Sequence, residues 1–175
     1  LGGAGIAIIL NLIISFSRIS DFDSQFREVS KSLSSPPLIV SLICAGIIVP
    51  VVEELIFRGL IFNRIKNQYN TIAAILISSL MFGIYHMNLT QGLYATILGL
   101  CIAYVYNKVG NFLIPVMIHM SANIIVLIIG EFGENIEYTS LSTMHMIFVL
   151  IFIVVLPLIS AIAGILYFKR RNVNL

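Results

Sequence analysis

Residues 38–62 read LIVSLICAGIIVPVVEELIFRGLIF, an apolar run that carries Pro50 at its centre and then Glu53, Glu54 and Arg58. A helix needs about 20 mostly apolar residues to cross the hydrocarbon core of a bilayer, and this run is longer than that. Ionisable side chains at membrane depth cost free energy, so by default they mark functional positions. The run therefore predicts a membrane-crossing helix that carries part of a functional site.

The composition extends this prediction to the whole chain. Of its 175 residues, 59% are hydrophobic and only 10% are charged, whereas soluble domains are about 45–50% apolar and about 25% charged. A chain this short cannot bury so much apolar surface in one core. We therefore expect an integral membrane protein rather than a soluble enzyme, a disordered chain or a small disulfide-linked fold.

The net charge and the cysteine content indicate neither a nucleic-acid partner nor a disulfide-linked fold. The net charge of +2 is too small to indicate a nucleic-acid partner. Cys44 and Cys101 both lie in apolar runs, so they imply no disulfide framework.

Five further apolar segments, 2–16, 71–87, 92–107, 111–130 and 144–168, are candidates for membrane spans. The expected fold is all-α: a polytopic membrane bundle of about six transmembrane helices around a polar intramembrane cavity. We expect one transmembrane domain over 1–175, with a motif-bearing core at 38–130. The chain begins inside an apolar run, and we expect it to be trimmed at its N-terminus.

The distribution of charge predicts the orientation. Basic residues without neighbouring acids fall at alternate connections and at the C-terminus: Arg64, Lys66, Lys108, Lys169, Arg170 and Arg171. The opposite connections carry acids, among them the polar connection 17–35 and the segment 131–137. Because Lys and Arg near span ends favour the cytoplasmic side, we expect a cytoplasmic C-terminus.

Two adjacent carboxylates of the 38–62 run should differ in role. Glu54 and Arg58 are four residues apart, so they share a helix face and can form an ion pair. Glu53 is rotated by roughly 100° from Glu54, which leaves its carboxylate available for chemistry. The alternative is a buried ion pair that locks two helices together, with a spare acid that faces water.

Two other spans repeat the four-residue spacing. Phe82 and His86 share a helix face, so the ring can form a wall beside the imidazole, although a lone histidine on an apolar helix can be a simple packing residue. His119 and Asn123 can both donate hydrogen bonds toward one point; the alternative is a hydrogen bond between helices. Small residues at positions 95, 99 and 103 predict close helix packing.

Together these side chains are suited to peptide hydrolysis. A carboxylate and a histidine, Glu53 and His86, can hold a water and remove its proton. Donors such as His119 and Asn123 can stabilise the oxyanion that forms at the attacked carbonyl. No Gly-x-Ser-x-Gly nucleophile motif is present, and the two cysteines are interpreted as apolar filler.

A zinc protease is the metal-dependent alternative. A glutamate and two histidines could hold zinc, but there is no His-Glu-x-x-His motif and an amide is a poor zinc ligand. We therefore expect no metal and no cofactor.

The ordered motifs Glu53-Glu54-x-x-x-Arg58, Phe82-x-x-x-His86 and His119-x-x-x-Asn123 resemble the CPBP family of CAAX prenyl proteases and bacteriocin-processing or immunity proteins, also called the Abi family. The resemblance implies an all-helical intramembrane protease with a conical cavity open to the cytoplasm, in which a glutamate activates water. By this resemblance Glu53 and His86 activate the water, His119 and Asn123 form the oxyanion pocket, and Glu54, Arg58 and Phe82 support them.

The same resemblance implies the partners. We expect a peptide or protein substrate, either lipidated or bacteriocin-like, and a bacterial cell membrane, because the compact chain and its Lys169-Arg170-Arg171 tail look like the bacterial branch. Three alternatives stay open: a non-catalytic bacteriocin self-immunity or peptide-binding protein, a proton-coupled carrier, and a zinc-dependent membrane protease.

Overall fold

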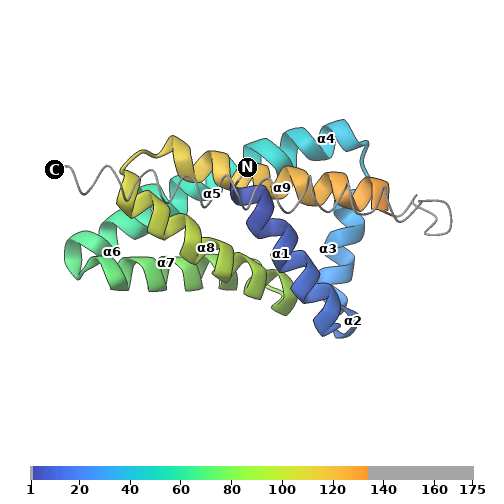
Figure 1. Ribbon diagram of the computed structural model, residues 1–175, viewed down its shortest axis with the longest axis horizontal. Helices are drawn as coiled ribbons and strands as arrows, with labels where there is room; N and C mark the ends of the chain where they lie inside the picture. Colours follow the sequence, from blue (N-terminus) through green and yellow to red (C-terminus); the bar gives the residue numbers. More distant parts are fainter. Residues whose placement is uncertain (1, 134–175) are drawn as a thin grey trace.

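The computed structural model describes residues 2–133, and within them every regular element is a helix (Figure 1). The predicted span 144–168 lies outside the described residues. The separate helices are α1 (Gly2–Ser17), α2 (Ile19–Phe22), α3 (Ser24–Ser34), α7 (Thr71–Tyr85), α8 (Leu89–Val109) and α9 (Leu113–Gly133). Between α3 and α7 a single long helix runs from Leu38 to Gln68. The all-α membrane helix bundle predicted from the sequence is confirmed.

The long helix changes its winding twice. It consists of α4 (Leu38–Ile43), a π-helical segment η1 (Cys44–Ile48), α5 (Val49–Glu54), a second π-helical segment η2 (Leu55–Phe62) and α6 (Asn63–Gln68). Pro50 lies in the first turn of α5, directly after η1. Proline lacks an N–H and crowds the preceding turn, and the wider π turn accommodates it without breaking the helix.

Small residues bring α7 and α8 into close contact. A Cβ added at Gly83 would lie 2.6 Å from the carbonyl oxygen of Gly92 and closer still to Thr96 Oγ1. Ala95, Gly99 and Ala103 are all buried, so the predicted stripe of small residues is a packing surface. On the other side of α8, α1 and α9 enclose an apolar cluster with α8, composed of Ala7, Leu10, Leu98, Ile102 and Ala122.

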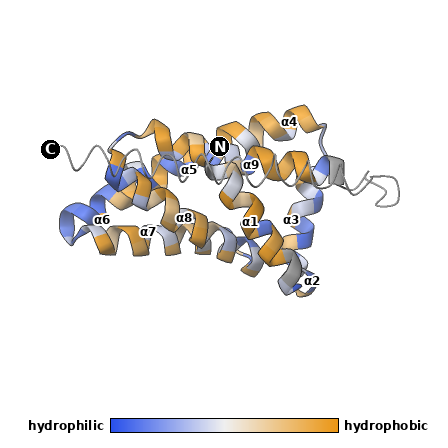
Figure 2. Cartoon of the chain, viewed as in Figure 1, coloured by the Kyte–Doolittle hydropathy of each residue, from blue (hydrophilic) through white to orange (hydrophobic). Residues whose placement is uncertain are grey.

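Large apolar side chains are exposed on the outside of the bundle, among them Ile39, Leu60 and Ile72, as expected for a surface that meets lipid. Hydrophobic residues predominate along most of its helices (Figure 2). Within residues 2–133, three helices are long and apolar enough to cross a membrane: Leu38–Gln68, Leu89–Val109 and Leu113–Glu131. The apolar helices Gly3–Ile14 and Thr71–Tyr85 are shorter. With 15 residues, α7 is about 22 Å long. The total of six spans remains a prediction.

The polar connection 17–35 contains the two helices α2 and α3. Phe26, Val29 and Leu33 recur at three- and four-residue spacing, which gives α3 one apolar face; the many polar residues of this segment obscured that pattern in the sequence. Asp23 caps α3, because its carboxylate accepts hydrogen bonds from the backbone N–H of Phe26 at 2.9 Å and of Thr90 at 2.8 Å. One carboxylate thus ties the start of α3 to the start of α8.

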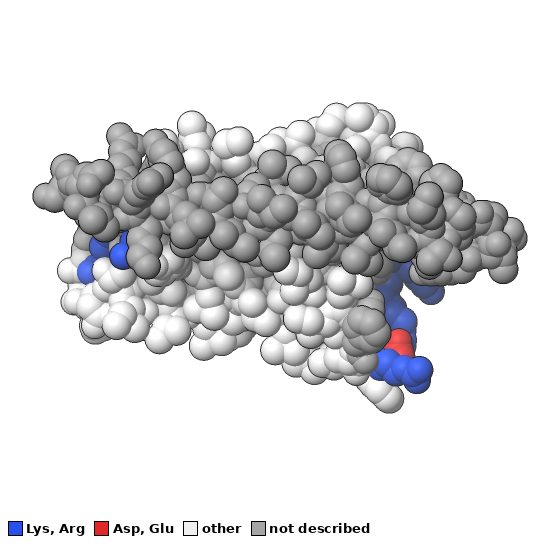
Figure 3. Space-filling model, viewed as in Figure 1, with Lys and Arg blue, Asp and Glu red and all other residues white. Residues whose placement is uncertain are grey.

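Charged side chains gather at the two ends of the molecule's long axis (Figure 3). Basic residues of α6 and of the end of α8 lie at one end, and the charged residues of α2 and α3 lie at the other. Between the two ends, the described residues visible on this face are uncharged, which is the arrangement expected of helices that cross a bilayer.

Candidate active site

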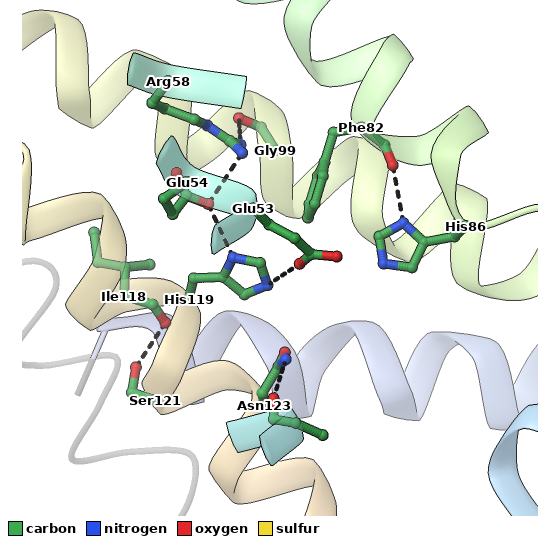
Figure 4. A network of polar contacts seen from close by, with 11 residues as sticks. Glu53, Glu54, Arg58, Phe82, His86, Gly99, Ile118, His119, Ser121 and Asn123 are labelled. Atoms are coloured by element: carbon green, nitrogen blue, oxygen red, sulfur yellow. Dashed lines mark hydrogen bonds and ion pairs between the residues drawn. The ribbon is translucent and has the colours of Figure 1, made fainter. Parts of the chain in front are cut away.

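Glu54 is the centre of a buried polar network that joins three helices (Figure 4). Its Oε1 accepts a hydrogen bond from Arg58 Nη1 at 3.0 Å and lies 2.9 Å from Nδ1 of His119, on α9. Arg58 Nη2 donates at 3.1 Å to the carbonyl oxygen of Gly99, on α8. Glu54 and Arg58 are both 0% exposed. The pair predicted from the four-residue spacing is present, and it also holds His119.

Glu53 points to the other side of the same helix turn. Its Oε2 lies 3.6 Å from His119 Nε2, so the two nitrogens of one imidazole face two different carboxylates. In Figure 4 the carboxylate of Glu53 lies between His119 and His86. Its second oxygen makes no hydrogen bond to any residue of the described part of the chain. Glu53 therefore keeps acceptor capacity for a water or a substrate.

Phe82 is the shared wall of this site. Its ring centroid lies 5.0 Å from that of His86 and 5.4 Å from that of His119, both in edge-on geometry. The guanidinium carbon of Arg58 lies 4.9 Å from the same centroid. Gly99 makes room for this arrangement, because a Cβ there would lie 3.2 Å from Phe82 Cδ1 and 3.3 Å from Arg58 Nη2.

His86 sits at the C-terminal end of α7, where the chain turns toward α8. Its Nδ1 lies 2.9 Å from the carbonyl oxygen of Phe82, which is one turn earlier. If Nδ1 donates this bond, Nε2 is the unprotonated nitrogen and faces the site. The next residue, Met87, has a φ of 59°, a left-handed conformation that few non-glycine residues adopt. Chain reversal directly after His86 fixes its place at the edge of the site.

Asn123 forms a hydrogen bond between helices, which is the alternative to an oxyanion donor that the sequence analysis left open. Its Nδ2 donates to the carbonyl oxygen of Ala45 at 2.9 Å. In η1 the N–H of Val49 bonds to the carbonyl of Cys44, so the same register would pair Ala45 with residue 50. That residue is Pro50, which has no N–H. The amide of Asn123 therefore satisfies a carbonyl that the proline leaves unpaired, and its second N–H remains for other acceptors.

The predicted site residues thus differ in how closely the structure brings them together. Glu53, Glu54, Arg58 and His119 are in direct polar contact, and Phe82 connects them to His86. His119 and Asn123 do not donate to a common acceptor, since His119 faces the two glutamates and Asn123 binds Ala45.

The sequence interpretation missed three participants. The carbonyls of Gly99 and Ala45 take part through their backbone, which no residue type reveals. Asp23 could have been recognised as a helix cap, but its bond to Thr90 joins residues 67 positions apart.

Within residues 2–133, no three His, Cys, Asp or Glu side chains form a group able to hold a metal ion. In that part of the chain His119 uses both nitrogens toward Glu53 and Glu54, while His86 lies on the other side of Glu53 (Figure 4).

Comparison with known proteins adds independent information. The profile of the type II CAAX prenyl endopeptidase Rce1-like family matches residues 35–125, a range that contains all the predicted site residues. The protein named "Putative membrane peptidase YdiL" of Bacillus subtilis (strain 168) is 34% identical over 96 residues, which are 55% of this chain and 38% of that protein. The UPF0177 protein YxdF of Lactococcus lactis subsp. lactis (strain IL1403) is 37% identical over 114 residues, 65% of this chain and 62% of that protein.

The chain therefore spans less than two thirds of the length of these curated relatives. No solved structure matches it at a significant level.

Proposed function

Because this chain belongs to the Rce1-like type II CAAX prenyl endopeptidase family, we propose that it is an intramembrane endopeptidase that hydrolyses a peptide bond with an activated water. The observation that supports this most is the convergence of Glu53, Glu54 and His119, each at most 6% exposed, in the interior of an apolar bundle. Buried ionisable groups at this depth are costly, and a purely structural contact between helices does not need all three.

In the proposed reaction Glu53 and His86 hold the water between them. The unpartnered oxygen of Glu53 accepts the proton of the water as its oxygen attacks the carbonyl carbon. The C–N bond then breaks, and the proton held by Glu53 passes to the leaving nitrogen. One water is consumed and one acid and one amine are formed, so no other reactant is needed.

The developing oxyanion needs donors that are already in place. His119 is the first, because Glu54 at 2.9 Å from Nδ1 fixes the ring with Nε2 directed toward Glu53, where the water and the carbonyl would lie. An N–H at Nε2 would donate to the oxyanion. The second N–H of Asn123 is the other. Glu54 and Arg58 act as positioning residues, since they hold His119 and do not face the substrate themselves.

Substitution of Glu53 by Gln tests the proposal. Glu53→Gln keeps the size of the side chain and removes the base, so peptide cleavage by the purified protein in lipid nanodiscs should fall by about 10²–10⁴-fold. Glu28→Gln, on the exposed side of α3, is the matched control and should leave cleavage unchanged. Cleavage that survives in Glu53→Gln contradicts the mechanism.

Treating the purified protein with a strong chelator tests the alternative that it is a zinc protease. Activity that resists a strong chelator supports the glutamate-activated water. Activity that the chelator removes and zinc restores assigns the reaction to a zinc protease instead.

We propose a peptide or protein substrate, lipidated or bacteriocin-like, that reaches the site from the bilayer. Self-immunity against a bacteriocin is the second candidate function, which the resemblance to the family's immunity proteins favours. Cells that express Glu53→Gln separate the two: protection from a peptide toxin that survives this substitution assigns immunity to binding, and protection that disappears with it assigns it to proteolysis.

We propose that the protein lies in a bacterial cell membrane with its C-terminus in the cytoplasm, as the distribution of Lys and Arg indicates. The basic end with α6 then faces the cytoplasm, and α3 faces the exterior (Figure 3). His86 belongs to the α3 end, because it directly precedes α8, whose start is bound by Asp23. The site would then be nearer the external face, whereas the family resemblance implies a cytoplasmic cavity.

A labelling experiment decides between these orientations. Ser24→Cys, in a background that carries Cys44→Ser and Cys101→Ser, should react with an impermeant maleimide added to intact cells. Reaction only after the membrane is permeabilised contradicts the proposed orientation.

A further inference from the structure

The turn that joins α7 to α8 holds the chain at His86 in a strained conformation. The last hydrogen bonds of α7 run from the N–H of His86 to the carbonyl of Gly83 and from the N–H of Met87 to the carbonyl of Ile84, both at 3.1 Å. Met87 then has a φ of 59°. A residue other than glycine stays in such a conformation only where its surroundings determine it. A neighbouring group must therefore hold the backbone directly after His86.

The side chain of Asn88 holds this turn. Its Nδ2 donates at 3.0 Å to the backbone carbonyl oxygen of His86 and at 3.0 Å to Oε1 of Gln91. Its Oδ1 accepts a hydrogen bond from the backbone N–H of Gln91 at 2.8 Å, which makes Asn88 the N-cap of α8. Asn88 is only 8% exposed. One buried carboxamide thus ties the backbone of His86 to the first turn of α8.

The two contacts of Asn88 make different demands on the side chain. The carbonyl of His86 can only accept a hydrogen bond and the N–H of Gln91 can only donate one, so together they need a donor and an acceptor on one side chain. Serine and aspartate cap a helix about as well as asparagine. An ionised aspartate has no donor, however, and serine offers a single oxygen on a shorter side chain. The cap of α8 does not require asparagine, whereas the link to His86 does.

The link leads from a rigid base to the imidazole. The N–H of Gly92 bonds to the carbonyl of Asn88 at 2.9 Å, and Gly92 lies in the close contact between α7 and α8 described above. On the other side of the link, Nδ1 of His86 lies 2.9 Å from the carbonyl oxygen of Phe82. Asn88 therefore fixes the backbone of His86 while Phe82 fixes its ring, and the imidazole keeps its place beside Glu53 (Figure 4).

We propose that Asn88 is a positioning residue for the reaction, which acts by holding the backbone of His86 so that the imidazole stays where it binds the attacking water. Asn88 itself does not touch the water or the substrate. This inference rests on the proposed peptidase function, in which Glu53 and His86 hold the water between them.

A pair of capping asparagines tests the proposal. Asn70 caps α7 as Asn88 caps α8, since its Oδ1 accepts from the backbone N–H of Ala73 at 2.8 Å, but it lies at the opposite end of α7 from His86. Asn88→Ser and Asn70→Ser both retain a capping oxygen, and only Asn88→Ser removes the link to His86. Small displacements of a reacting group can cost up to about 10²-fold in rate.

We therefore expect Asn88→Ser to lower kcat for peptide cleavage by about 10- to 100-fold and to leave KM nearly unchanged. Asn70→Ser should leave both constants unchanged, and the two variants should melt at similar temperatures. Asn88→Asp, which keeps the size and the cap but has no N–H, should repeat the loss and serves as the second variant if Asn88→Ser does not fold. An equal loss in Asn70→Ser, or a kcat that both Asn88 variants leave at the wild-type value, overturns the proposal.

A double-mutant cycle separates positioning of His86 from general support of the fold. If Asn88 acts through His86, Asn88→Ser should cause no further loss of the cleavage that remains in His86→Ala. A further loss of the same size as in the wild type would mean that Asn88 supports the site as a whole, and it would overturn the proposal.

An NMR experiment distinguishes failure of this proposal from failure of the proposed function. The chain contains three histidines, so the spectrum of protein labelled with ¹³C-histidine is simple, and His86→Gln and His119→Gln assign the ring signals. Asn88→Ser should shift or broaden the signals of His86 and leave those of His119 in place, and Asn70→Ser should leave both. Unchanged His86 signals in Asn88→Ser overturn the positioning role even if peptides are cleaved. Altered His86 signals in a protein that cleaves no peptide retain the link between Asn88 and His86 and reject the peptidase.

Discussion

Two regions of the molecule are stabilised differently: the polar core around Glu54, and the helix α3 (Ser24–Ser34) at one end of the bundle, which we call the α3 wall. In the polar core, Glu54 and Arg58 are 0% exposed and bind groups from α8 and α9. The α3 wall has no buried residue. It is fixed by the Asp23 carboxylate at its start and, at its end, by the hydroxyl of Ser41, which donates to the carbonyl of Leu33 at 2.9 Å.

This difference in burial separates the region of the proposed reacting groups from a region that can open locally. Regions with few buried contacts open at low free-energy cost, whereas densely packed ones open only with global unfolding. The proposed reacting groups sit in the part that opens only with global unfolding, and a cavity lined by α3 is bounded by the part that can open locally. Each of the following predictions breaks or sharpens that contrast.

Breaking the polar core should have the largest effect. Glu54→Ala leaves Arg58 as an unpaired charge in an apolar interior, which should cost about 3–5 kcal/mol of unfolding free energy. Glu28→Ala, an exposed acid of the α3 wall, should change it by less than about 0.5 kcal/mol. Unfolding in mixed detergent micelles measures both. Similar values for the two variants would remove the distinction between the regions.

The contact between α7 and α8 is the next test. In Gly83→Ala the new methyl group would meet the carbonyl oxygen of Gly92 at 2.6 Å, so the variant should lose about 1–3 kcal/mol. Gly130→Ala is the matched control, because nothing lies within 4 Å of a Cβ there and alanine favours a helix by up to about 1 kcal/mol. A Gly83→Ala protein as stable as the control would show that the two helices can separate without loss.

The link between Asn123 and Pro50 can be measured with a double-mutant cycle. Asn123→Ala leaves the Ala45 carbonyl unpaired and should cost about 1 kcal/mol or somewhat more. In Pro50→Ala, residue 50 regains an N–H that can bind that carbonyl, so Asn123→Ala should cost less in this background. We expect a coupling free energy of at least about 0.5 kcal/mol. Strictly additive values would mean that the amide does not substitute for the missing N–H.

The smallest effect should be that of pH on the α3 wall. Hydrogen bonds from the backbone N–H groups of Thr90 and Phe26 lower the pKa of Asp23. A lowered pKa stabilises the fold above the ordinary carboxyl range, and this contribution is lost as the pH falls through the lowered value. The difference in melting temperature between wild type and Asp23→Asn should therefore be present at neutral pH and disappear in strong acid.

Asp21→Asn controls for the loss of a charge at neutral pH, because within the described residues the Asp21 side chain forms no hydrogen bond with α8, whereas that of Asp23 does. A difference between wild type and Asp23→Asn that stays constant down to strong acid would mean that the carboxylate does not hold α3.

Local patterns predicted the parts that local geometry determines. The apolar runs predicted a helical membrane bundle, and four-residue spacing predicted the Glu54–Arg58 pair and the contact between Phe82 and His86. These features depend only on the 3.6-residue repeat of a helix. The catalytic roles of the site residues stay a prediction, as do the orientation and the substrate.

The parts that escaped prediction depend on tertiary contacts or on changes in helix winding. The sequence does not show that Glu54 would lie against His119, 65 residues away. Pro50 is visible in the sequence as a residue that disturbs a helix, but the π segment that accommodates it, and the hydrogen bond from Asn123 to Ala45, depend on the packing of α9. The sequence analysis identified 17–35 only as a polar connection and did not predict α3, because the many polar residues of this segment obscure the spacing of Phe26, Val29 and Leu33.

One dimension of α7 has a consequence for the lipid around it. As a predicted span, a helix of about 22 Å is shorter than a hydrocarbon layer of about 30 Å, so we expect the bilayer to thin on that side of the protein. His86 ends this helix, so we expect headgroups and water to be drawn down to the level of its imidazole. A reaction that consumes water inside an apolar bundle would then obtain it through a local dimple in the membrane.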